Sequence, residues 1–489
     1  MTRRQTDVVV VGGGMAGMCA SLSALEEHAR VITVEKGSRS GGSMRLSGGV
    51  IWTFISKADL REMIPGGNAV LQDMVLDDWP EGIAWLEGHG VILEAEKGFK
   101  AYGRGRSASP SDLTWLFECR LQDLGGELEL ETPMDALLYE DGVVRGVRVS
   151  SPGGAVDIEA GAVVLATGGF QGNPELLARY VTPHADKVYL RGNPWSTGDG
   201  FLAATGVGAA VTPAMSAFYG HALPAPPAGF GPKELRDMTQ RQGHVSVCIN
   251  LDGRRFADES GGTGEEHLTQ AMALQRDATA VYITDAGIAE IPLRQGLPRT
   301  FTERLRNRGG PVIERQTLEE LCEAMESWGV AGARALLTLR EFNQALAQGY
   351  PEQLDPPRQG NHFPIMKPPF TAVLVRPGIT FTHGGLEVDT ELRVLRRSSS
   401  SSTLPLAIAE HSEVKFSPIP NLYAAGCDVG NVSNAGYMGG LATAVATGRR
   451  AGRGAAACAQ SGETAGLAVP ASKSRTLLLG TGAEGRSTW

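Results

Sequence analysis

The residues with the clearest chemical meaning stand near the N-terminus, where Gly12, Gly14 and Gly17 form a G-x-G-x-x-G pattern. In such a loop the first glycine permits a tight turn and the second lets the backbone approach a pyrophosphate. The third allows the following helix to pack closely on its strand. Glu35 follows 18 positions after Gly17, where a carboxylate can accept hydrogen bonds from a ribose hydroxyl. The combination predicts a dinucleotide site, and the acid disfavours a ribose that carries a 2′-phosphate.

The elements expected around this loop support the prediction. Residues 7–11 are a β-branched run typical of a central parallel strand that is buried on both faces. An alanine- and leucine-rich helix follows the glycines, and residues 31–34 are expected to form a second strand. The N-terminus of the helix then faces the phosphates with the positive end of its dipole.

Further strands are indicated along the chain. Residues 135–149 predict a β-hairpin, because Asp141-Gly142 separates two arms of alternating apolar residues. Residues 162–166 predict a strand that runs into a glycine turn, as expected where the backbone must come near a ligand. Later strands are expected at residues 370–375, 385–394 and 422–426.

A change in sequence pattern along the chain predicts two domains, one of which is discontinuous. Between residues 201 and 370, proline-rich loops and short helices replace the parallel-strand pattern. We expect residues 1–200 and 371–460 to form an α/β, Rossmann-like domain, with residues 201–370 inserted as an α+β capping domain around the substrate. Residues 461–489 are expected to be a flexible tail, and the serine run 398–402 a surface loop.

Composition excludes several classes of protein. With 42% hydrophobic and 20% charged residues in 489, the chain is globular rather than disordered. A net charge of −9 disfavours binding to the negatively charged phosphates of nucleic acid. The six cysteines form no C-x-x-C pair, so we expect no metal site or iron–sulfur cluster and a reducing, cytoplasmic setting. No run of 18 apolar residues predicts a transmembrane segment.

Other motifs follow the first glycine loop in a characteristic order. They are Gly41 to Gly49 (GGSMRLSGG), Ala166 to Phe170 (ATGGF), Ser196 to Gly200 (STGDG), Asp252 to Glu259 (DGRRFADE), Thr382 to Gly385 (THGG) and Ala424 to Gly426 (AAG). Over about residues 7 to 455 the chain therefore resembles flavoproteins of the fumarate reductase and 3-ketosteroid dehydrogenase superfamily, which includes tricarballylate dehydrogenase. The resemblance implies that the dinucleotide is FAD. It also implies that hydrogen is added or removed across a carbon–carbon bond beside a carbonyl or carboxylate, through flavin N5.

The resemblance also assigns the residues that hold the cofactor. They are Gly12, Gly14, Met15, Ala16, Gly17, Glu35, Lys36, Gly42, Ser43, Ser47, Gly48, Gly49, Ala136, Ala166, Thr167, Gly168, Asp199, Gly426, Asp428, Gly440 and Leu441. Members of the superfamily with a covalent flavin carry a histidine shortly after the second glycine run. Here Ser43, Met44 and Arg45 occupy that stretch, so we expect noncovalent FAD.

The chain departs from the fumarate reductases at two places. Those enzymes use an arginine acid soon after an R-F-x-x-E motif and a second arginine, in N-R-L-G-G, that grips a substrate carboxylate. Residues 260–266 (SGGTGEE) and 435–440 (AGYMGG) contain no arginine. Because the planar guanidinium binds carboxylates in two places at once, its loss disfavours a small dicarboxylate substrate.

Tyr437 stands where the second arginine is missing. It lies nine positions after Asp428, in a context similar to the tail of ketosteroid dehydrogenases, where a tyrosine hydroxyl donates to the substrate carbonyl. A neutral phenol suits an enolising ketone, because it can donate to the oxygen as negative charge develops. Those enzymes carry a glycine where this chain has Leu441, so the resemblance does not extend to steroid specificity. An ordinary buried tyrosine is the alternative.

Three more residues are candidates for proton transfer. His383 interrupts a glycine turn expected beside the flavin, where it is a base, a partner of the enolate, or only a hydrogen-bond partner of the ring. His221 resembles the position of a substrate-binding histidine in fumarate reductases. Tyr219 beside it would be the base in a ketosteroid-like mechanism, and a merely structural role is the alternative for both.

The leading prediction is an FAD-dependent enzyme that dehydrogenates a carbon–carbon bond adjacent to a carbonyl. Tyr437 would hold the oxygen, and His383 or a capping-domain residue would take the proton. The alternatives are a reductase of an activated alkene, a polycarboxylate dehydrogenase of the tricarballylate type, a noncatalytic flavin carrier and an NAD-binding dehydrogenase. The expected partners are a small carbonyl or carboxylate substrate and an external electron acceptor or donor, since no cysteine cluster supplies an internal relay.

Overall fold

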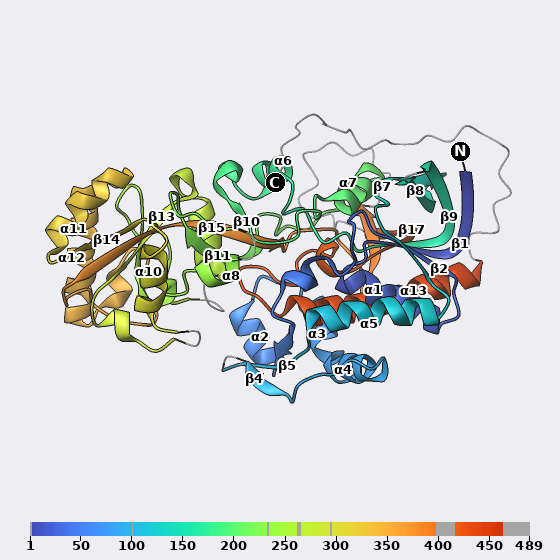
Figure 1. Ribbon diagram of the computed structural model, residues 1–489, viewed down its shortest axis with the longest axis horizontal. Coiled ribbons are helices and arrows are strands. Elements are labelled where there is room, and N and C mark those ends of the chain that lie inside the picture. Colours follow the sequence, from blue (N-terminus) through green and yellow to red (C-terminus); the bar gives the residue numbers. More distant parts are fainter. Residues whose placement is uncertain are drawn as a thin grey trace, which may run out of the picture.

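The computed structural model describes residues 2–99, 101–151, 153–231, 234–261, 266–293, 296–397 and 416–462. Figure 1 shows an elongated molecule with one large sheet at each end and helices packed along both. The first glycine loop belongs to the sheet at the right of this view. A smaller sheet with its own helices lies below the middle of the molecule.

The large sheet that carries the first glycine loop is called the nucleotide sheet below. It takes its strands from two separate parts of the chain, residues 2–165 and 393–424. Its main path runs β16-β17-β9-β1-β2-β6, and β7 and β8 extend it through β9. The strands are β1 (Thr2–Val11), β2 (Val31–Val34), β6 (Glu127–Glu129), β7 (Met134–Glu140), β8 (Val143–Ser151), β9 (Gly154–Leu165), β16 (Arg393–Arg397) and β17 (Phe416–Ala424). β1 pairs in parallel with β2 and β9, so its valines are covered on both faces, as a central strand requires.

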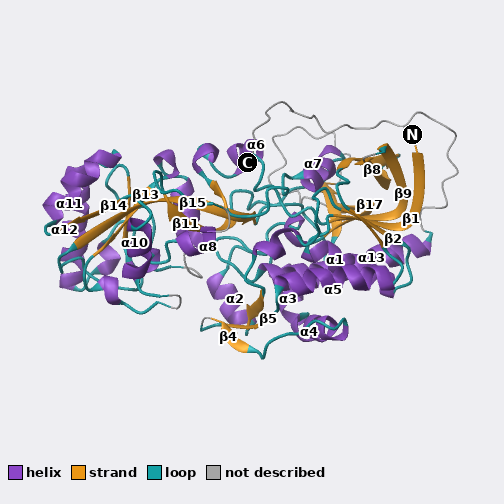
Figure 2. Cartoon of the chain, in the orientation of Figure 1, coloured by secondary structure: helices purple, strands orange, loops and turns teal. Residues whose placement is uncertain are grey.

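Three helices cover one face of this sheet: α1 (Met15–Glu26), α5 (Pro110–Asp123) and α13 (Gly440–Ser461). α13 lies against α1 at backbone contact distance (Figure 2). A Cβ added to Gly448 would stand 2.3 Å from the Ala16 carbonyl oxygen, and one added to Gly452 would stand 2.1 Å from that of Ala20. Small residues of α13 therefore allow it to pack directly on the backbone of α1.

The second sheet is organised around one long strand, β15 (Phe370–Thr382). β15 pairs with four strands and continues through β13 to β12. The strands are β10 (Tyr189–Leu190), β11 (Phe218–Pro224), β12 (Val247–Asn250), β13 (Ala280–Thr284) and β14 (Val312–Arg315). The helices of this part of the chain are α8 (Leu235–Met238), α9 (Glu266–Ala273), α10 (Pro298–Arg306), α11 (Leu318–Met325) and α12 (Gly332–Gln348).

The smaller sheet comes from the first hundred or so residues. It contains β3 (Val50–Phe54), β4 (Lys97–Phe99) and β5 (Gly103–Ser107), accompanied by α2 (Lys57–Met63), α3 (Ala69–Asp77) and α4 (Trp79–Gly88). Two short helices, α6 (Pro174–Tyr180) and α7 (Asp199–Gly206), follow the glycine turn after β9. None of the helices in the described ranges is long and apolar enough to cross a bilayer.

The R-F-x-x-E motif forms a buried ion cluster in the second sheet region. Arg255 donates to Glu259 at 2.6 Å, and Arg358 approaches the same carboxylate at 3.3 Å. All three side chains are at most 2% exposed, and both guanidinium groups lie over the ring of Phe342. Removing one of the three side chains would leave a buried charge uncompensated, so such a substitution should destabilise this region.

The predicted fold class is confirmed: the protein has a mainly parallel nucleotide sheet with a second α+β region between its segments. The strands predicted at 7–11, 31–34, 162–166 and 422–426 lie largely within β1, β2, β9 and β17. The predicted hairpin is β7 and β8, which turn at Asp141-Gly142.

One predicted strand is wrong. Residues 385–394 form isolated bridges instead of a continuous strand, and β16 begins only at Arg393. The carboxylate of Asp389 accepts hydrogen bonds from the backbone of Glu391 and Arg393, and Leu392 has a positive φ of 62°. These bonds make a tight turn, which interrupts the alternating pattern that suggested a strand.

The predicted domain boundaries at 200, 370 and 460 stay predictions. The second sheet takes its strands from within residues 189–382, which overlaps both neighbouring segments. The serine run 398–402 and most of the predicted tail 461–489 lie outside the described residues.

Candidate active site

The first glycine loop joins β1 to α1 and leaves space in front of the helix. A Cβ on Gly12 would stand 2.3 Å from the Ala166 carbonyl oxygen, and one on Gly17 would stand 1.8 Å from that of Gly12. These two glycines are required by packing within the protein itself. A Cβ on Gly14, by contrast, would meet nothing within 4 Å. The N-terminus of α1 therefore faces an open cradle that fits a pyrophosphate.

Glu35 lies directly beside this loop, at the end of β2. Its carboxylate accepts hydrogen bonds from the backbone N–H groups of Gly13 at 2.8 Å and Gly37 at 2.7 Å. The side chain is 7% exposed, and these two bonds fix its orientation. A carboxylate held in this way has further lone pairs with which to accept from ribose hydroxyls.

The structure brings several other predicted cofactor residues to the same place. Lys36 pairs with Asp199 at 2.6 Å. Gly41 N–H donates to the Gly13 carbonyl, and Gly42, which begins a 3₁₀ turn over Gly42–Leu46, lies close to Gly14. Ser43 is in this turn, whereas Ser47, Gly48 and Gly49 lie just beyond it, where Ser47 Oγ accepts from Gly49 N–H. Ala136 is buried in β7, which follows a segment hydrogen-bonded to the backbone of Glu35.

Asp428 joins the glycine turns at the ends of β9 and β17. Its carboxylate accepts from the backbone N–H and the hydroxyl of Thr167, and from Gly169 N–H at 3.4 Å. Burial raises the pKa of Asp428 to about 6 despite these bonds. Gly426 approaches Ala16 so closely that a Cβ would lie 2.8 Å from the alanine side chain. Ala166, Thr167 and Gly168 therefore meet Gly426 and Asp428 in front of α1, where Met15 and Ala16 begin the helix.

A cluster of aromatic rings lies where the two large sheets meet. Tyr219 of β11 stacks on Tyr437, with ring centroids 4.0 Å apart and an interplanar angle of 20°. Phe381, at the end of β15, lies 5.2 Å from Tyr219, and Trp52 of β3 packs edge-on against Tyr437 at 5.4 Å. Each ring comes from a different segment, so this cluster exists only in the folded chain.

The hydroxyl of Tyr437 is buried and neutral. It accepts a hydrogen bond from Gly440 N–H at 2.8 Å, which turns the phenol proton away from Gly440. Burial raises the pKa of the phenol far above its ordinary value, and the nearby Tyr219 and Glu266 raise it further. Tyr437 is therefore a neutral phenol rather than an anion at any ordinary pH, and its hydroxyl can donate a hydrogen bond. Leu441 follows in the first turn of α13 and packs against the core.

The candidate pair from β11 is hydrogen-bonded. Tyr219 Oη and His221 Nε2 are 3.0 Å apart, as expected of alternate residues that share one face of a strand. His221 is 8% exposed. The phenol and the imidazole thus form a continuous path along which a proton can move.

His383 is buried in the turn after β15 and is 4% exposed. Its backbone N–H donates to Ala217, while its Nε2 has no partner among the described residues. Burial lowers the pKa of His383 to about 3, so the imidazole is neutral. This turn borders a small opening lined by Phe381, Thr382, His383, Gly426, Cys427, Val429, Val432, Ser433, Gly440 and Thr443. A buried ring nitrogen without a partner among the described residues fits a site completed by a ligand.

Glu266 is a site residue that the sequence analysis missed. It lies in the first turn of α9, is 3% exposed, and is close enough for its charge to raise the pKa of Tyr437. One turn later Gln270 donates to the carbonyls of Phe218 and Asn434, beside Tyr219 and Tyr437. The spacing of Glu266 and Gln270 on one helical face was the available signal.

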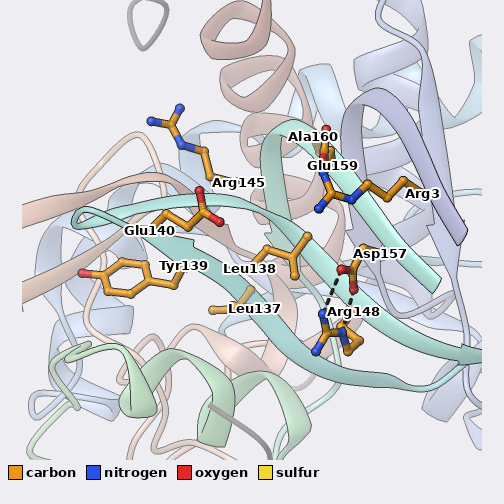
Figure 3. Close-up of a pocket in the computed structure, with 10 residues that line it drawn as sticks. All are labelled: Arg3, Leu137, Leu138, Tyr139, Glu140, Arg145, Arg148, Asp157, Glu159 and Ala160. Atoms are coloured by element: carbon orange, nitrogen blue, oxygen red, sulfur yellow. Dashed lines mark hydrogen bonds and ion pairs between the residues drawn. The ribbon is translucent and has the colours of Figure 1, made fainter. Parts of the chain in front are cut away.

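A larger pocket lies elsewhere and has no link to these residues. Figure 3 shows its lining residues, which come from β1, β7, β8 and β9 and include Arg148, paired with Asp157 at 2.6 Å. It is lined by Arg3, Leu137, Leu138, Tyr139, Glu140, Arg145, Arg148, Asp157, Glu159 and Ala160. No predicted site residue is among them, so size alone does not identify the active site. No group of three or more His, Cys, Asp or Glu side chains within the described ranges could hold a metal ion.

Comparison with known proteins places the chain among flavoproteins. A family model described as "FAD binding domain" matches residues 7–443. The chain is 28% identical over 480 residues to a probable fumarate reductase of Shewanella frigidimarina, covering 92% of this chain and 75% of that one. It is 24% identical over 532 residues to the 3-oxosteroid 1-dehydrogenase of Mycolicibacterium smegmatis, with coverages of 82% and 90%.

A solved structure supports the same conclusion. The open conformation of a flavocytochrome c3 fumarate reductase matches with a TM-score of 0.64 and 26% identity, over 93% of this chain and 79% of that one. Together with the open cradle in front of α1, these matches confirm that the dinucleotide is FAD. The roles predicted for individual site residues are tested by none of them and stay predictions.

Two alanine substitutions should separate the packing and ligand functions of the glycine loop. Gly14→Ala should leave the stability of the flavin-free protein unchanged but weaken FAD binding, because its Cβ points into the cradle. Gly17→Ala should destabilise the protein itself, since its Cβ would overlap the Gly12 carbonyl oxygen. Thermal unfolding without flavin and FAD titration of each variant measure the two effects. Equal stability losses in both variants would contradict the assignment.

The buried neutral His383 should make stability depend on pH. Below the ordinary histidine pKa of about 6.5 the unfolded chain binds a proton that folded His383 refuses, so stability falls as pH falls. Between pH 7 and pH 5 the wild-type protein should lose about 2 kcal/mol more unfolding free energy than His383→Met. Urea unfolding at the two pH values tests this. Parallel losses in the two proteins would show that the imidazole is protonated in the fold.

Proposed function

The chain belongs to the FAD binding domain family, within the fumarate reductase and 3-ketosteroid dehydrogenase superfamily, and we propose that it dehydrogenates a carbon–carbon bond beside a carbonyl. FAD, when bound, supplies the acceptor for the hydride. The observation that carries the proposal is the buried, stacked pair of Tyr219 and Tyr437 beside the opening lined by Phe381 and His383.

Tyr437 has the properties of a group that holds a carbonyl oxygen. Its phenol is neutral, buried and already oriented by Gly440 N–H, so little reorganisation is needed when it donates to a substrate. As hydrogen leaves the neighbouring carbon, negative charge develops on the oxygen, and a fixed donor in a low-dielectric site stabilises it.

Tyr219 and His221 can take the second hydrogen as a proton. We assign proton removal to this pair because the Tyr219 hydroxyl can pass its own proton to His221 Nε2 as it accepts the substrate's. The hydride leaves with both electrons of the broken C–H bond, and the proton moves to the protein. The product is an alkene conjugated with the carbonyl.

His383 suits a different role. A histidine with a pKa of about 3 is a poor proton acceptor near neutral pH, whereas a neutral imidazole can still donate or accept one hydrogen bond. We therefore assign His383 to positioning the flavin ring or the enolate, one of the alternatives that the sequence leaves open.

The surroundings of the tyrosines support a cyclic ketone more than a small dicarboxylate. The rings packed on them are Trp52 and Phe381, which form an apolar wall. The buried carboxylate of Glu266 stands nearby, and the two arginines of the fumarate reductase motifs are absent from the sequence. A flat apolar substrate with one carbonyl group matches this environment.

Reduction of an activated alkene is the second candidate. The match to a probable fumarate reductase at 28% identity favours it, and so does a match at 26% to the urocanate reductase of Eggerthella lenta. The same residues would serve, because Tyr219 and His221 would then deliver a proton and the flavin a hydride. The direction depends on whether the external partner accepts or donates electrons. The aromatic surroundings of Tyr219 and Tyr437 give less support to a polycarboxylate dehydrogenase or a noncatalytic carrier.

Two further features belong to the proposal. We propose that FAD is noncovalent, because Ser43, Met44 and Arg45 occupy the stretch that carries an attachment histidine in covalent members. We also propose a reducing, cytoplasmic setting, in keeping with six free cysteine thiols.

Removing either hydroxyl should slow flavin reduction by substrate. Under anaerobic conditions a saturated cyclic ketone should bleach the flavin band of the wild-type protein. Tyr437→Phe and Tyr219→Phe should each lower the rate by about 10² to 10⁴-fold, the usual contribution of a positioned donor or base. Tyr180→Phe, in an aromatic cluster with Phe170 and Phe201, is the matched control and should not change the rate.

The substrate panel should include polycarboxylates and conjugated alkenes. Bleaching by a polycarboxylate alone, or unchanged rates in both tyrosine variants, would overturn the proposed roles. Reoxidation of chemically reduced enzyme by a conjugated ketone, without bleaching by any saturated compound, would favour the reductase.

Acid precipitation distinguishes the two modes of flavin attachment. Noncovalent FAD should be released intact into the supernatant, because the stretch after Gly42 carries no histidine to which the ring could be attached. The absorbance spectra of supernatant and pellet measure its distribution. Yellow colour that stays with the washed pellet would contradict noncovalent binding.

A further inference from the structure

The loop between β10 and α7, residues 191–198, is tied to the rest of the fold along its length. Arg191 N–H donates to the Ile379 carbonyl at 2.7 Å, and Gly172 N–H donates to that of Ser196 at 2.8 Å. Gly198 N–H donates to the Gly169 carbonyl at 3.0 Å. A loop held at its start, middle and end has a constrained backbone, so the points from which its side chains project are fixed.

This loop extends across the predicted cofactor residues. Near its start Asn193 lies close to Gly42, whose hypothetical Cβ would be 3.8 Å from Asn193 Nδ2. Near its end Thr197 accepts a hydrogen bond from Lys36 Nζ. The loop therefore reaches from the glycines that surround the pyrophosphate cradle to the segment that follows Glu35.

Trp195 stands beside the ribose-binding carboxylate. A Cβ added to Gly37 would stand 3.0 Å from Glu35 Oε1 and 3.4 Å from Trp195 Cδ1. The carboxylate and the indole therefore lie on either side of Gly37. Trp195 is nevertheless 52% exposed. A large ring kept half in water on a fixed loop forgoes the free energy that its burial would provide, unless a ligand covers it.

We propose that Trp195 closes the adenosine end of the cofactor site by stacking its indole on the adenine of FAD. The ribose hydroxyls bound by Glu35 place the attached base within reach of a ring on the other side of Gly37. Adenine is a flat π-system, and stacking on an aromatic side chain needs no particular hydrogen-bond pattern.

A pair of flavins tests the proposal directly, since FMN has the isoalloxazine and one phosphate but lacks the adenosine. FAD and FMN are titrated separately into flavin-free protein, and flavin fluorescence gives both Kd values. Trp195→Ala should raise the Kd for FAD by roughly 10- to 100-fold, the usual effect of losing one base–aromatic stack. The Kd for FMN should stay within about twofold of wild type, and Trp195→Phe should recover most of the FAD affinity.

Trp115→Ala is the matched control. Trp115 is 65% exposed on α5 and lies outside the loop that carries Trp195, so its removal should leave both Kd values unchanged. A similar loss of FAD and FMN affinity in Trp195→Ala would mean that the ring only supports the loop. An unchanged Kd for FAD would mean that the adenine lies elsewhere, and either result overturns the proposal.

Discussion

Close backbone contact at the N-terminus of α1 is the constraint on which the rest of the structure depends. Gly17 and Gly426 leave no room for a Cβ against Gly12 and Ala16, and Gly448 and Gly452 allow α13 to lie directly on α1. These contacts bring the first and last described segments of the chain into one layer. The turn that carries Asp428 and the loop that carries Tyr437 therefore meet the phosphate cradle from the opposite end of the sequence.

One strand of the second sheet, β15, contributes residues to the candidate active site. β15 carries the pairing partners of the capping region along most of its length and ends in Phe381, Thr382 and His383, which border the opening near Tyr437. Because β11 pairs with the same end of β15, Tyr219 and His221 arrive beside them. Burial at this junction keeps the Tyr437 phenol and the His383 imidazole uncharged, so hydrogen-bond donation dominates the local chemistry.

The site retains the cofactor architecture of its relatives but differs from the fumarate reductase pattern in the groups that would meet the substrate. At the two positions where those enzymes carry arginines, this chain has Tyr437 and a segment, residues 260–266, that contains no cationic side chain. Glu266 adds a buried carboxylate. A phenol binds one oxygen by one hydrogen bond, whereas a guanidinium binds two oxygens of a carboxylate. The proposed preference for a ketone over a dicarboxylate rests on this difference in side-chain chemistry rather than on a difference of fold.

The sequence by itself determined the parts of this protein that depend on neighbours in the chain. The loop from Gly12 to Gly17, the strand that ends before Glu35 and the turn at Asp141-Gly142 follow from local backbone geometry and short-range periodicity. The turn at Asp389 broke such a pattern, because one side chain bonded to the backbone two and four residues ahead. Tertiary structure alone decided the stack of Tyr219 on Tyr437, the approach of Glu266 and the position of Trp195 beside Glu35. Each of these joins segments that no local pattern relates, and they meet only after the helices and sheets have packed.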